Sequence, residues 1–522
     1  MNKLNNNIEI EYCASCDTEH RKKFAQFFTP YDIADIMSAW LLSNKNLNTV
    51  LEPAFGLGIF SRIILSKRNV SIRGFEIDKR IYDTAVKEFY GIDSFELILR
   101  DYMFNDWENK YDGIICNPPY FKFHDYDNKV ILNEFEKRLG YKFNGFTNLY
   151  TLFLLKSIHQ LADNGRLAYI VPSEFMNSDY GKLIKSFIIN SGVLRHIAVI
   201  DFKENIFDDA MTTASVIFCA KDNYRGKIQF HNVKNKSDFN IITEVINKYP
   251  KITETKNTYN INDIDPNIKW KSYYQTQNSI KYKNLVPFAH YAKVCRGIAT
   301  GDNEYFTFNE EKIFSYKIPK NYLSPCVTKA NHVQKPFFGI NDFNQLSSNN
   351  KRVYILDPVE LDNTHIKKYI QYGEEQGVNK KFLTSRRSPW YSRENREPAP
   401  IWVSVFSRDG LKFIKNEANI LNLTAFHGIY PKNNLLFDID IDLLFAYLLT
   451  NTAKEIFIDN SREYGNGLTK FEPNDINNSL MADINLLSQN EREKIIKLLN
   501  EYRLTADNKI IKEIDNIIIN IC

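Results

Sequence analysis

The chain has 522 residues, of which 43% are hydrophobic and 25% charged, and its formal net charge is only +4. A chain of this length is too long to fold around one ordinary core, which favours two or three domains. Because the charges nearly balance, a polyanionic partner must be inferred from local basic clusters. The cysteines show no framework spacing, no apolar run reaches the length of a membrane span and no apolar signal opens the chain, so we expect a soluble, reduced, cytoplasmic protein.

Residues 1–22 are polar and rich in asparagine, which predicts a loose N-terminal arm. Cys13 and Cys16 form a single CxxC there, with His20 nearby but no second pair. Zinc in structural sites takes four ligands, so we expect no metal site. In the next segment Thr29 is expected to cap a helix that has Pro30 at its first position and runs to about residue 42.

Residues 48–65 predict a strand, a glycine-bearing loop and a helix, which is the first βα turn of a doubly wound fold. A second strand, 70–77, ends at Glu76, at the distance from the glycine loop where an acidic residue accepts hydrogen bonds from ribose hydroxyls. A nicotinamide cofactor is the rival ligand. However, the loop lacks the third glycine of GxGxxG, and Glu52 would repel a pyrophosphate. A cationic sulfonium fits better beside that carboxylate, which makes S-adenosylmethionine the candidate cofactor.

The third and fourth predicted strands, 95–99 and 112–116, lead to Asp101 and Asn117. Asp101 is expected to accept a hydrogen bond from an adenine amino group. Four successive strands then deliver Glu52, Glu76, Asp101 and Asn117 to one edge of a parallel sheet, which is where open α/β sheets bind ligands. This order of polar residues is more specific than any one of them alone.

The fourth strand continues into Asn117-Pro118-Pro119-Tyr120. An exocyclic amino group is a poor nucleophile because its lone pair is delocalised. The side-chain oxygen of Asn117 and the carbonyl of Pro118 can each accept one of its N–H groups and aim the lone pair at an electrophile. The prolines keep this segment extended, and Tyr120 offers a ring face to a planar, unstacked substrate. The alternative is a simple turn after a strand.

After a long loop expected over 121–146, the αβ alternation resumes with helices at 147–161 and 180–190 and strands at 166–171, 196–202 and 213–220. Phe207 lies in the loop between the last two strands. It is expected either to be a packing residue or to provide the second face of an aromatic sandwich around a flipped base.

Residues 226–285 are rich in lysine and asparagine and predict a connector, and 286–522 show a different pattern of short strands and turns. The most distinctive feature of this second half is a basic run interleaved with aromatic residues, a composition suited to phosphate contacts and base stacking. The candidate DNA-binding residues are Lys380, Lys381, Arg386, Arg387, Trp390, Tyr391 and Arg393. The final segment, 491–519, has the periodicity of two helices.

The order Phe-Phe-Thr-Pro, Glu-Pro-Ala-Phe-Gly-Leu-Gly, Gly-Phe-Glu-Ile-Asp, Arg-Asp-Tyr and Asn-Pro-Pro-Tyr resembles the gamma class of N6-adenine DNA methyltransferases, the Taq-type enzymes. The resemblance implies a Rossmann-like methyltransferase domain over 23–225, followed by a mixed α/β target-recognition domain over 286–522. It implies that Asn117 and Pro118 polarise the target amino group and that Tyr120 and Phe207 stack on a flipped adenine. The implied cofactor pocket consists of Phe28, Thr29, Glu52, Gly56, Glu76, Ile77, Asp101, Tyr102 and Asn117.

We therefore expect a monomeric methyltransferase that moves a methyl group from S-adenosylmethionine to adenine in double-stranded DNA. It would be either the modification enzyme of a restriction-modification system, with a separate cognate endonuclease, or an orphan methylase. Methylation of RNA adenine or of protein glutamine uses the same chemistry, but neither is expected to place the Thr-Pro segment first. A DNA-binding subunit without activity is disfavoured by the intact Asn117 and Tyr120. A fused helicase is not expected, because the sequence contains no GxxxxGK[ST] motif.

Overall fold

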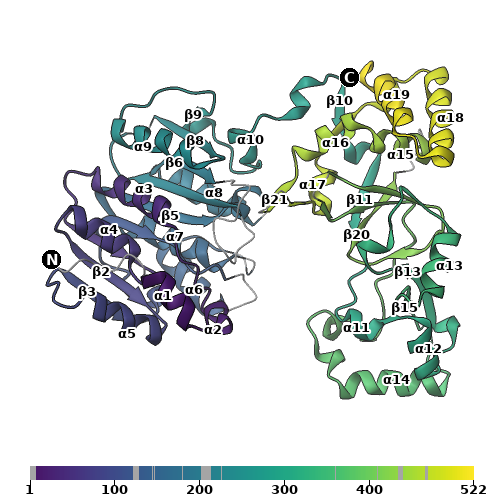
Figure 1. Cartoon of the computed structure of the whole chain (residues 1–522), viewed down its shortest axis with the longest axis horizontal. Helices are drawn as coiled ribbons and strands as arrows, with labels where there is room; N and C mark the ends of the chain where they lie inside the picture. Colours follow the sequence, from purple (N-terminus) through teal and green to yellow (C-terminus); the bar gives the residue numbers. More distant parts are fainter. Residues whose placement is uncertain are drawn as a thin grey trace. The chain divides into compact units, whose positions relative to one another are not determined.

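The computed structural model describes residues 8–121, 128–143, 145, 147–178, 180–200, 213–224, 226–358, 360–407, 410–432, 439–464 and 468–522. The chain divides into two compact units, each with its own core (Figure 1). Unit 1 comprises Met1–Thr276 with Glu463–Gly467, and unit 2 comprises Gln277–Arg462 with Leu468–Cys522. Among the described helices, none has the length and apolar character needed to cross a membrane.

Unit 1 is built on a nine-stranded sheet with the order β3-β2-β1-β4-β5-β7-β6-β8-β9. Strands β1 to β5 are parallel, and β7 pairs antiparallel with both β5 and β6. The chain builds outward from β1 to β2 and β3, and then returns to place β4 on the other side of β1. This reversal makes the β1–β4 boundary a topological switch point, where a crevice opens at the carboxyl ends of the strands.

The elements of unit 1 follow the predicted αβ alternation. They are α1 (Ile8–Ser15), α2 (Thr18–Lys23), α3 (Tyr31–Leu42), β1 (Thr49–Glu52), α4 (Ile59–Lys67), β2 (Ser71–Glu76), α5 (Lys79–Glu88), β3 (Phe95–Leu99), β4 (Tyr111–Cys116), α6 (Asn128–Leu139), α7 (Leu149–Gln160), β5 (Leu161–Pro172), α8 (Gly181–Asn190), β6 (Leu194–Ile200), β7 (Ala214–Ala220), β8 (Lys227–Val233), α9 (Phe239–Lys248), β9 (Thr258–Asn260) and α10 (Lys271–Tyr274).

Helices cover both faces of this sheet. Val50 and Ile115 pack in a core with residues of α3, α4 and α9, whereas Leu51 and Ile114 pack in a second core with residues of α7 and α8. Neighbouring residues of one strand point to opposite faces, so a strand buried on both faces must be apolar throughout. That requirement explains why the central strands were recognisable as continuous apolar runs.

The prediction of a loose N-terminal arm over 1–22 is wrong for the described residues, because they form α1 and α2, which belong to unit 1. Ile8, Tyr12 and Cys16 are buried and pack with Leu57 and Ile81. The segment has few apolar residues, so its short helices are stabilised by packing against the rest of unit 1 more than by their own helix propensity.

The long loop expected over 121–146 contains α6. Ile131 and Phe135, four residues apart on one face, are buried against the core of α7. A single apolar stripe on a charged helix gives a weak periodic signal, and the prediction of an irregular loop was wrong at 128–139.

The segment 226–285 differs from the connector that we expected. Strand β8 pairs parallel with β6 and antiparallel with β9, and α9 contributes Ile242 and Ile246 to the sheet core. Unit 1 therefore extends to Thr276, some fifty residues beyond the predicted boundary. Most lysines and asparagines of this segment are exposed or half-buried, and they concealed the buried residues Ile228, Phe230 and Val233 of β8.

Unit 2 combines a five-stranded sheet, β11-β20-β16-β18-β14, with a four-stranded sheet, β12-β15-β13-β19, and a two-stranded pair, β10-β23. Its largest core joins the first sheet to α15, α16, α18 and α19. The two helices predicted over 491–519 are confirmed as α18 and α19, which bury Leu499 and Ile514.

The elements of unit 2 combine short strands, as the turn-rich sequence indicates, with helices of up to 17 residues. They are β10 (Leu285–Pro287), β11 (Ala292–Arg296), α11 (Asn303–Phe306), β12 (Thr307–Phe308), α12 (Glu310–Tyr316), β13 (Leu323–Val327), β14 (Phe337–Phe338), α13 (Ile340–Ser348), β15 (Tyr354–Leu356), α14 (Thr364–Glu375), β16 (Ile401–Ser404), β17 (Phe406–Ser407), β18 (Phe413–Asn416), β19 (Leu421–Asn422), β20 (Phe426–Pro431), α15 (Ile441–Leu449), α16 (Asn451–Ile458), β21 (Arg462–Tyr464), β22 (Leu468–Lys470), α17 (Pro473–Asn477), β23 (Leu480–Ala482), α18 (Gln489–Thr505) and α19 (Asn508–Ile519).

Candidate active site

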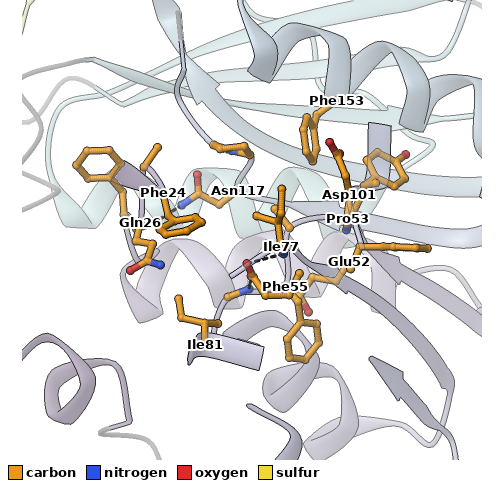
Figure 2. A pocket seen from close by; sticks show the side chains of 18 of the residues that line it. Phe24, Gln26, Glu52, Pro53, Phe55, Ile77, Ile81, Asp101, Asn117 and Phe153 are labelled. Carbon is orange, nitrogen blue, oxygen red and sulfur yellow. Dashed lines mark hydrogen bonds between the residues drawn. The ribbon is translucent and has the colours of Figure 1, made fainter. Parts of the chain in front are cut away.

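A cavity of about 440 Å³ lies in unit 1 at the carboxyl ends of β1, β2, β3 and β4 (Figure 2). The polar residues that end these strands, Glu52, Glu76, Asp101 and Asn117, all line it. All nine residues predicted for the cofactor pocket, including Phe28, line this one cavity. Its volume is in the range of small-molecule sites.

The glycine loop between β1 and α4 forms one wall of the cavity. Gly56 and Gly58 have φ values of +56° and +75°, in the left-handed region that favours glycine. A Cβ on Gly58 would lie 2.5 Å from the ring carbon Cζ of Phe55, whereas a Cβ on Gly56 would lie 3.9 Å from Cε1 of Phe28. The loop therefore needs glycine at both positions for conformation, and at Gly58 also for space.

Glu76 holds this loop against the end of β2. Its Oε2 accepts a hydrogen bond from the N–H of Gly56 at 2.9 Å, and its Oε1 accepts from the N–H groups of Ile77 and Asp78, each at 2.8 Å. Burial raises the pKa of this carboxyl group, although the three hydrogen bonds oppose that shift. The carboxylate thus fixes the loop, and its predicted contact with ribose hydroxyls stays a prediction.

Glu52 is the most deeply buried acid of the cavity, with an exposed fraction of 1%. The hydroxyl of Ser61 donates to its Oε2 at 2.5 Å. Burial raises the pKa of Glu52 to about 8, so the side chain is mostly protonated at neutral pH. A cationic ligand in the cavity would favour the carboxylate and gain its attraction.

Asp101 begins the short 3₁₀ turn Tyr102–Phe104, because its Oδ1 accepts from the N–H of Met103 at 2.8 Å. Tyr102 is 2% exposed, and its hydroxyl donates to Oε1 of Gln160 at 2.5 Å. Tyr102 therefore serves the core as well as the cavity wall.

Lys156, on α7, holds the same turn from behind. Its ammonium group donates to the carbonyl oxygens of Tyr102 and Asn105 and lies 3.8 Å from the centroid of the Tyr102 ring. Burial lowers the pKa of Lys156 to about 7. Sequence reasoning missed this residue, since a lysine in an apolar helix gives no sign of its partners.

Asn117 is anchored through its amide nitrogen. Nδ2 donates to the carbonyl oxygen of Phe27 at 2.7 Å and to Oγ1 of Thr29 at 3.0 Å. A carbonyl oxygen can only accept, so the amide nitrogen must be on that side and the amide oxygen must point away from it. Oδ1 of Asn117 is buried, and it has no hydrogen-bond partner in the described part of the chain.

This contact corrects the expected role of Thr29. Helix α3 begins at Tyr31 with Pro30 at the N-cap position, and no side chain caps it. The hydroxyl of Thr29 accepts from Asn117 instead of from the helix backbone. The Thr-Pro segment thus orients the asparagine of the Asn-Pro-Pro-Tyr segment, although the two lie far apart in sequence.

Of the other residues predicted to be catalytic, Pro118 is buried and Tyr120 is half-buried, and neither lines the cavity, whereas Pro119 and Phe121 do. The hydroxyl of Tyr120 donates to the carbonyl oxygen of Ile170 at 3.4 Å. Phe207 lies outside the described residues, so its predicted stacking role stays a prediction.

Tyr120 has two aromatic neighbours in the described part of the chain: Tyr150, which it meets edge-on, and Phe27, which is stacked on it. For Phe27 and Tyr120 the geometry is that of an offset stack. The ring centroids lie 6.0 Å apart, and the ring planes differ by 19°. Sequence reasoning did not single out Phe27, although it precedes the Thr-Pro segment directly.

The N-terminal segment supplies a further wall that the sequence did not predict. Glu9 and Lys23 line the cavity, as do Phe24 and Gln26, which are labelled in Figure 2. Nε2 of Gln26 donates to Oδ2 of Asp78 at 2.6 Å.

The basic run of unit 2 contains two kinds of residue: some bind other parts of the protein, and others are exposed. The guanidinium of Arg387 donates to the carbonyl oxygens of Ala299, Thr300 and Ser392. Arg393 pairs with Asp357 at 2.7 Å.

Two aromatic residues of the run, Trp390 and Tyr391, are half-buried, and Nε1 of Trp390 donates to Glu374 at 3.0 Å. Lys381 pairs with Asp302 at 2.7 Å. Lys380 and Arg386 are exposed and form no ion pair within the part of the chain that the structure describes.

No group of three or more histidine, cysteine, aspartate or glutamate side chains in the described residues could hold a metal ion. Cys13 and Cys16 are not joined to each other in a disulfide.

The fold and the site together define a doubly wound α/β protein with a ligand cavity at its switch point and a second, mixed α/β unit. A family profile described as Eco57I restriction-modification methylase matches residues 39–207, and one described as type II methyltransferase M.Eco57I, C-terminal domain, matches residues 268–519. Type II methyltransferase M.AccI of Acinetobacter calcoaceticus is 58% identical over 521 residues, which cover 99% of this chain and 96% of that protein. The chain therefore belongs to the type II methyltransferases of restriction-modification systems.

More distant proteins agree in sequence and in fold. Type II methyltransferase M.HindII of Haemophilus influenzae is 25% identical over 81% of this chain and 78% of its own length. A nuclease-deletion mutant of the type ISP restriction-modification enzyme LlaGI, solved with a DNA substrate mimic, aligns with 91% of this chain and 54% of its own, at a TM-score of 0.53 and 12% identity. The DrdV–DNA complex aligns with 94% of this chain and 58% of its own, at a TM-score of 0.52 and 14% identity. These structures show that the fold is shared.

Proposed function

We propose that this protein transfers a methyl group from S-adenosylmethionine to the N6 amino group of a flipped-out adenine in duplex DNA. The observation that carries the proposal is the state of Asn117: its nitrogen is held by Phe27 and Thr29, and its buried oxygen has no partner within the described residues. A buried acceptor without a donor is costly, and an amino group of a bound substrate would supply that donor.

The cavity next to Asn117 suits the proposed cofactor. S-adenosylmethionine combines a cationic sulfonium and an amino acid with a ribose and an adenine. Glu52 would attract the positive charge, the ribose hydroxyls would lie near Glu76, and Asp101 would accept from the adenine amino group. The positive φ of Gly56 and Gly58 lets the loop turn at the cavity wall without a side chain at either position. When bound, the cofactor supplies an electrophilic methyl group.

The protein's own part is to bind and orient the amino group. Oδ1 of Asn117 and the carbonyl oxygen of Pro118 would each accept one N–H, which localises the nitrogen lone pair and directs it toward the cavity. Tyr120 would stack on the base. Displacement at a sulfonium methyl depends on alignment of the reacting atoms more than on acid or base catalysis, and the described residues that line the cavity include no histidine.

Duplex DNA is the proposed substrate because a large second unit carries exposed basic residues and because the relatives are restriction-modification methylases. Adenine is proposed on the resemblance of the motif order to the gamma class. An adenine inside the stack cannot present its amino group to this site, so the base must leave the helix. A separate endonuclease would be the partner of such a modification enzyme.

The test is to incubate the purified protein with labelled S-adenosylmethionine and unmethylated duplex DNA and to identify the modified nucleoside by mass spectrometry. We expect N6-methyladenine. Replacing Asn117 by alanine should slow transfer about 100-fold or more, because an oriented hydrogen-bond partner of the reacting group is lost, while DNA binding stays close to wild type. Asn46→Ala, at an exposed asparagine outside the cavity, is the matched control.

The outcomes separate the parts of the proposal. Full activity of the Asn117→Ala variant would refute the mechanism, and label on cytosine would refute the choice of base. Transfer to RNA or to a glutamine peptide in preference to duplex DNA would refute the substrate.

A further inference from the structure

Phe382 is an exposed aromatic residue within the basic run of unit 2, in the segment that follows α14 (Figure 1). Its side chain is 66% exposed, and that of the next residue, Leu383, is 37% exposed. The guanidinium carbon of Arg386 lies 3.8 Å from the centroid of the Phe382 ring. Lys380 and Lys381 precede the ring and are also exposed. Lys381 pairs with Asp302, so Lys380 and Arg386 are the cations that accompany this apolar tip.

The segment that carries this tip is held rigidly from beneath. Val378 is buried in a core of unit 2, and the hydroxyl of Thr384, itself fully buried, donates to the carbonyl oxygens of Val378 and Lys381. Short backbone hydrogen bonds close the turn, from the N–H of Ser385 to the carbonyl of Lys381 at 2.9 Å and from that of Arg387 to Thr384 at 3.1 Å.

A second set of contacts ties the turn to a neighbouring loop. Arg387 binds the carbonyl oxygens of Ala299 and Thr300, and a Cβ on Gly301 would lie 3.1 Å from Cβ of Leu383. The backbone of the tip is therefore fixed on both sides while its largest side chains point to solvent. Such preorganisation lowers the cost of ordering the tip on binding.

We propose that Phe382, with Leu383 beside it, is an apolar wedge that enters duplex DNA between base pairs, with Lys380 and Arg386 on the adjacent phosphates. This inference rests on the proposed function and names a contact that the basic residues alone do not imply. Proteins that deform DNA insert phenylalanine or leucine side chains between base steps and surround them with cations. The exposed cations favour a polyanionic ligand. The exposed aromatic ring favours a nucleic acid, whose stacked bases it can separate.

The test compares variants of the full-length protein in binding to a mixed pool of unmethylated duplex oligonucleotides, by fluorescence anisotropy over a series of salt concentrations. Phe382→Ala should raise Kd about 5- to 150-fold, the range expected for one lost stacking contact. The slope of log Kd against log salt should not change, because no charge is removed. Phe382→Leu, which keeps an apolar wedge, should recover part of the affinity.

Phe314 provides the matched control. It is 84% exposed on α12, which begins with Glu310 and Glu311 and carries no such basic run. Phe314→Ala should bind DNA like wild type. A loss of affinity that is equal for the two alanine variants, or absent in both, would overturn the proposal.

A direct readout of contact comes from Phe382→Trp. The chain has five tryptophans, and Trp40, Trp107, Trp270 and Trp402 are buried, so a new exposed indole is visible in the difference from wild type. Its emission should be quenched when duplex DNA is added, as expected for an indole stacked on bases, and that of Phe314→Trp should not. Unquenched emission with DNA bound would overturn the wedge. Failure of the wild-type protein to bind duplex DNA would instead refute the proposed function.

Discussion

At the residue scale, the position of one amide explains why two distant motifs occur together. Asn117 uses both of its donors on Phe27 and Thr29, so its orientation is set by the segment before α3 and not by the strand that carries it. The Thr-Pro segment therefore has a physical reason to accompany Asn-Pro-Pro-Tyr. This link could not be predicted from spacing, because the threonine is equally suited to cap a helix.

Lys156 is the residue whose burial has the clearest effect on pH dependence. Its pKa is lowered by burial to about 7 in the folded protein, against about 10.4 when unfolded. Between these values Lys156 is protonated in the unfolded state and largely neutral in the folded state, so its contribution to the free energy of unfolding rises with pH from about 7 to about 10.

Replacing Lys156 by methionine removes this dependence. We predict that the difference in unfolding free energy between wild type and Lys156→Met changes in favour of wild type by up to about 1.4 kcal/mol per pH unit over that range. Denaturant unfolding at a series of pH values measures it, and groups common to both proteins cancel. A difference that is constant with pH would show that the ammonium group is not desolvated.

At the scale of elements, the sequence predicted what periodicity and strand ends encode. The apolar runs of β1, β4 and β5 are buried on both faces, and polar residues at the ends of β1 to β4 meet in one cavity. The helices α1, α2 and α6 were missed, since each is a polar segment stabilised by a few apolar contacts with the rest of unit 1. The strand β8 was missed because its place in the sheet depends on pairing with β6 and β9, which lie elsewhere in the sequence. Local sequence carries little information about such docking.

The glycine loop between β1 and α4 permits a paired prediction. Gly58→Ala introduces both left-handed strain and a clash with Phe55 and Phe89, so we expect the free energy of unfolding to fall by about 2 to 5 kcal/mol. Gly56→Ala has the strain but room for its Cβ, and should cost about 1 to 2 kcal/mol. Chemical denaturation of the two variants measures these losses.

The same pair separates folding from binding. The new methyl group of Gly56→Ala would lie in the cavity wall near Phe28. We therefore expect weaker binding of S-adenosylmethionine, measured by calorimetry, in a variant that is still folded. Equal stability of the two variants would contradict the geometry of the loop.

At the scale of the whole molecule, a net charge of +4 is too small to attract DNA by itself. Affinity must come from the placement of particular cations, and composition alone could not say which ones. The basic run of unit 2 looks uniform in sequence, yet Arg387 donates to three backbone carbonyls, while its neighbour Arg386 is exposed and lies over the ring of Phe382. The predicted DNA-binding cluster thus contains residues that stabilise the surface and exposed residues that can contact phosphates.

Adjacent arginines with different partners make this division testable. Arg386→Ala should weaken binding to duplex DNA and reduce the slope of log Kd against log salt by about 1, the value for one phosphate contact, without changing stability. Arg387→Ala should leave that slope unchanged but lower the free energy of unfolding of unit 2 by about 2 to 3 kcal/mol, since a charged donor to several carbonyl groups is lost. Salt titrations of binding and denaturant unfolding of both variants decide the matter. The opposite assignment, with Arg387 controlling the slope, would mean that its contacts to Ala299 and Thr300 yield to phosphate when DNA binds.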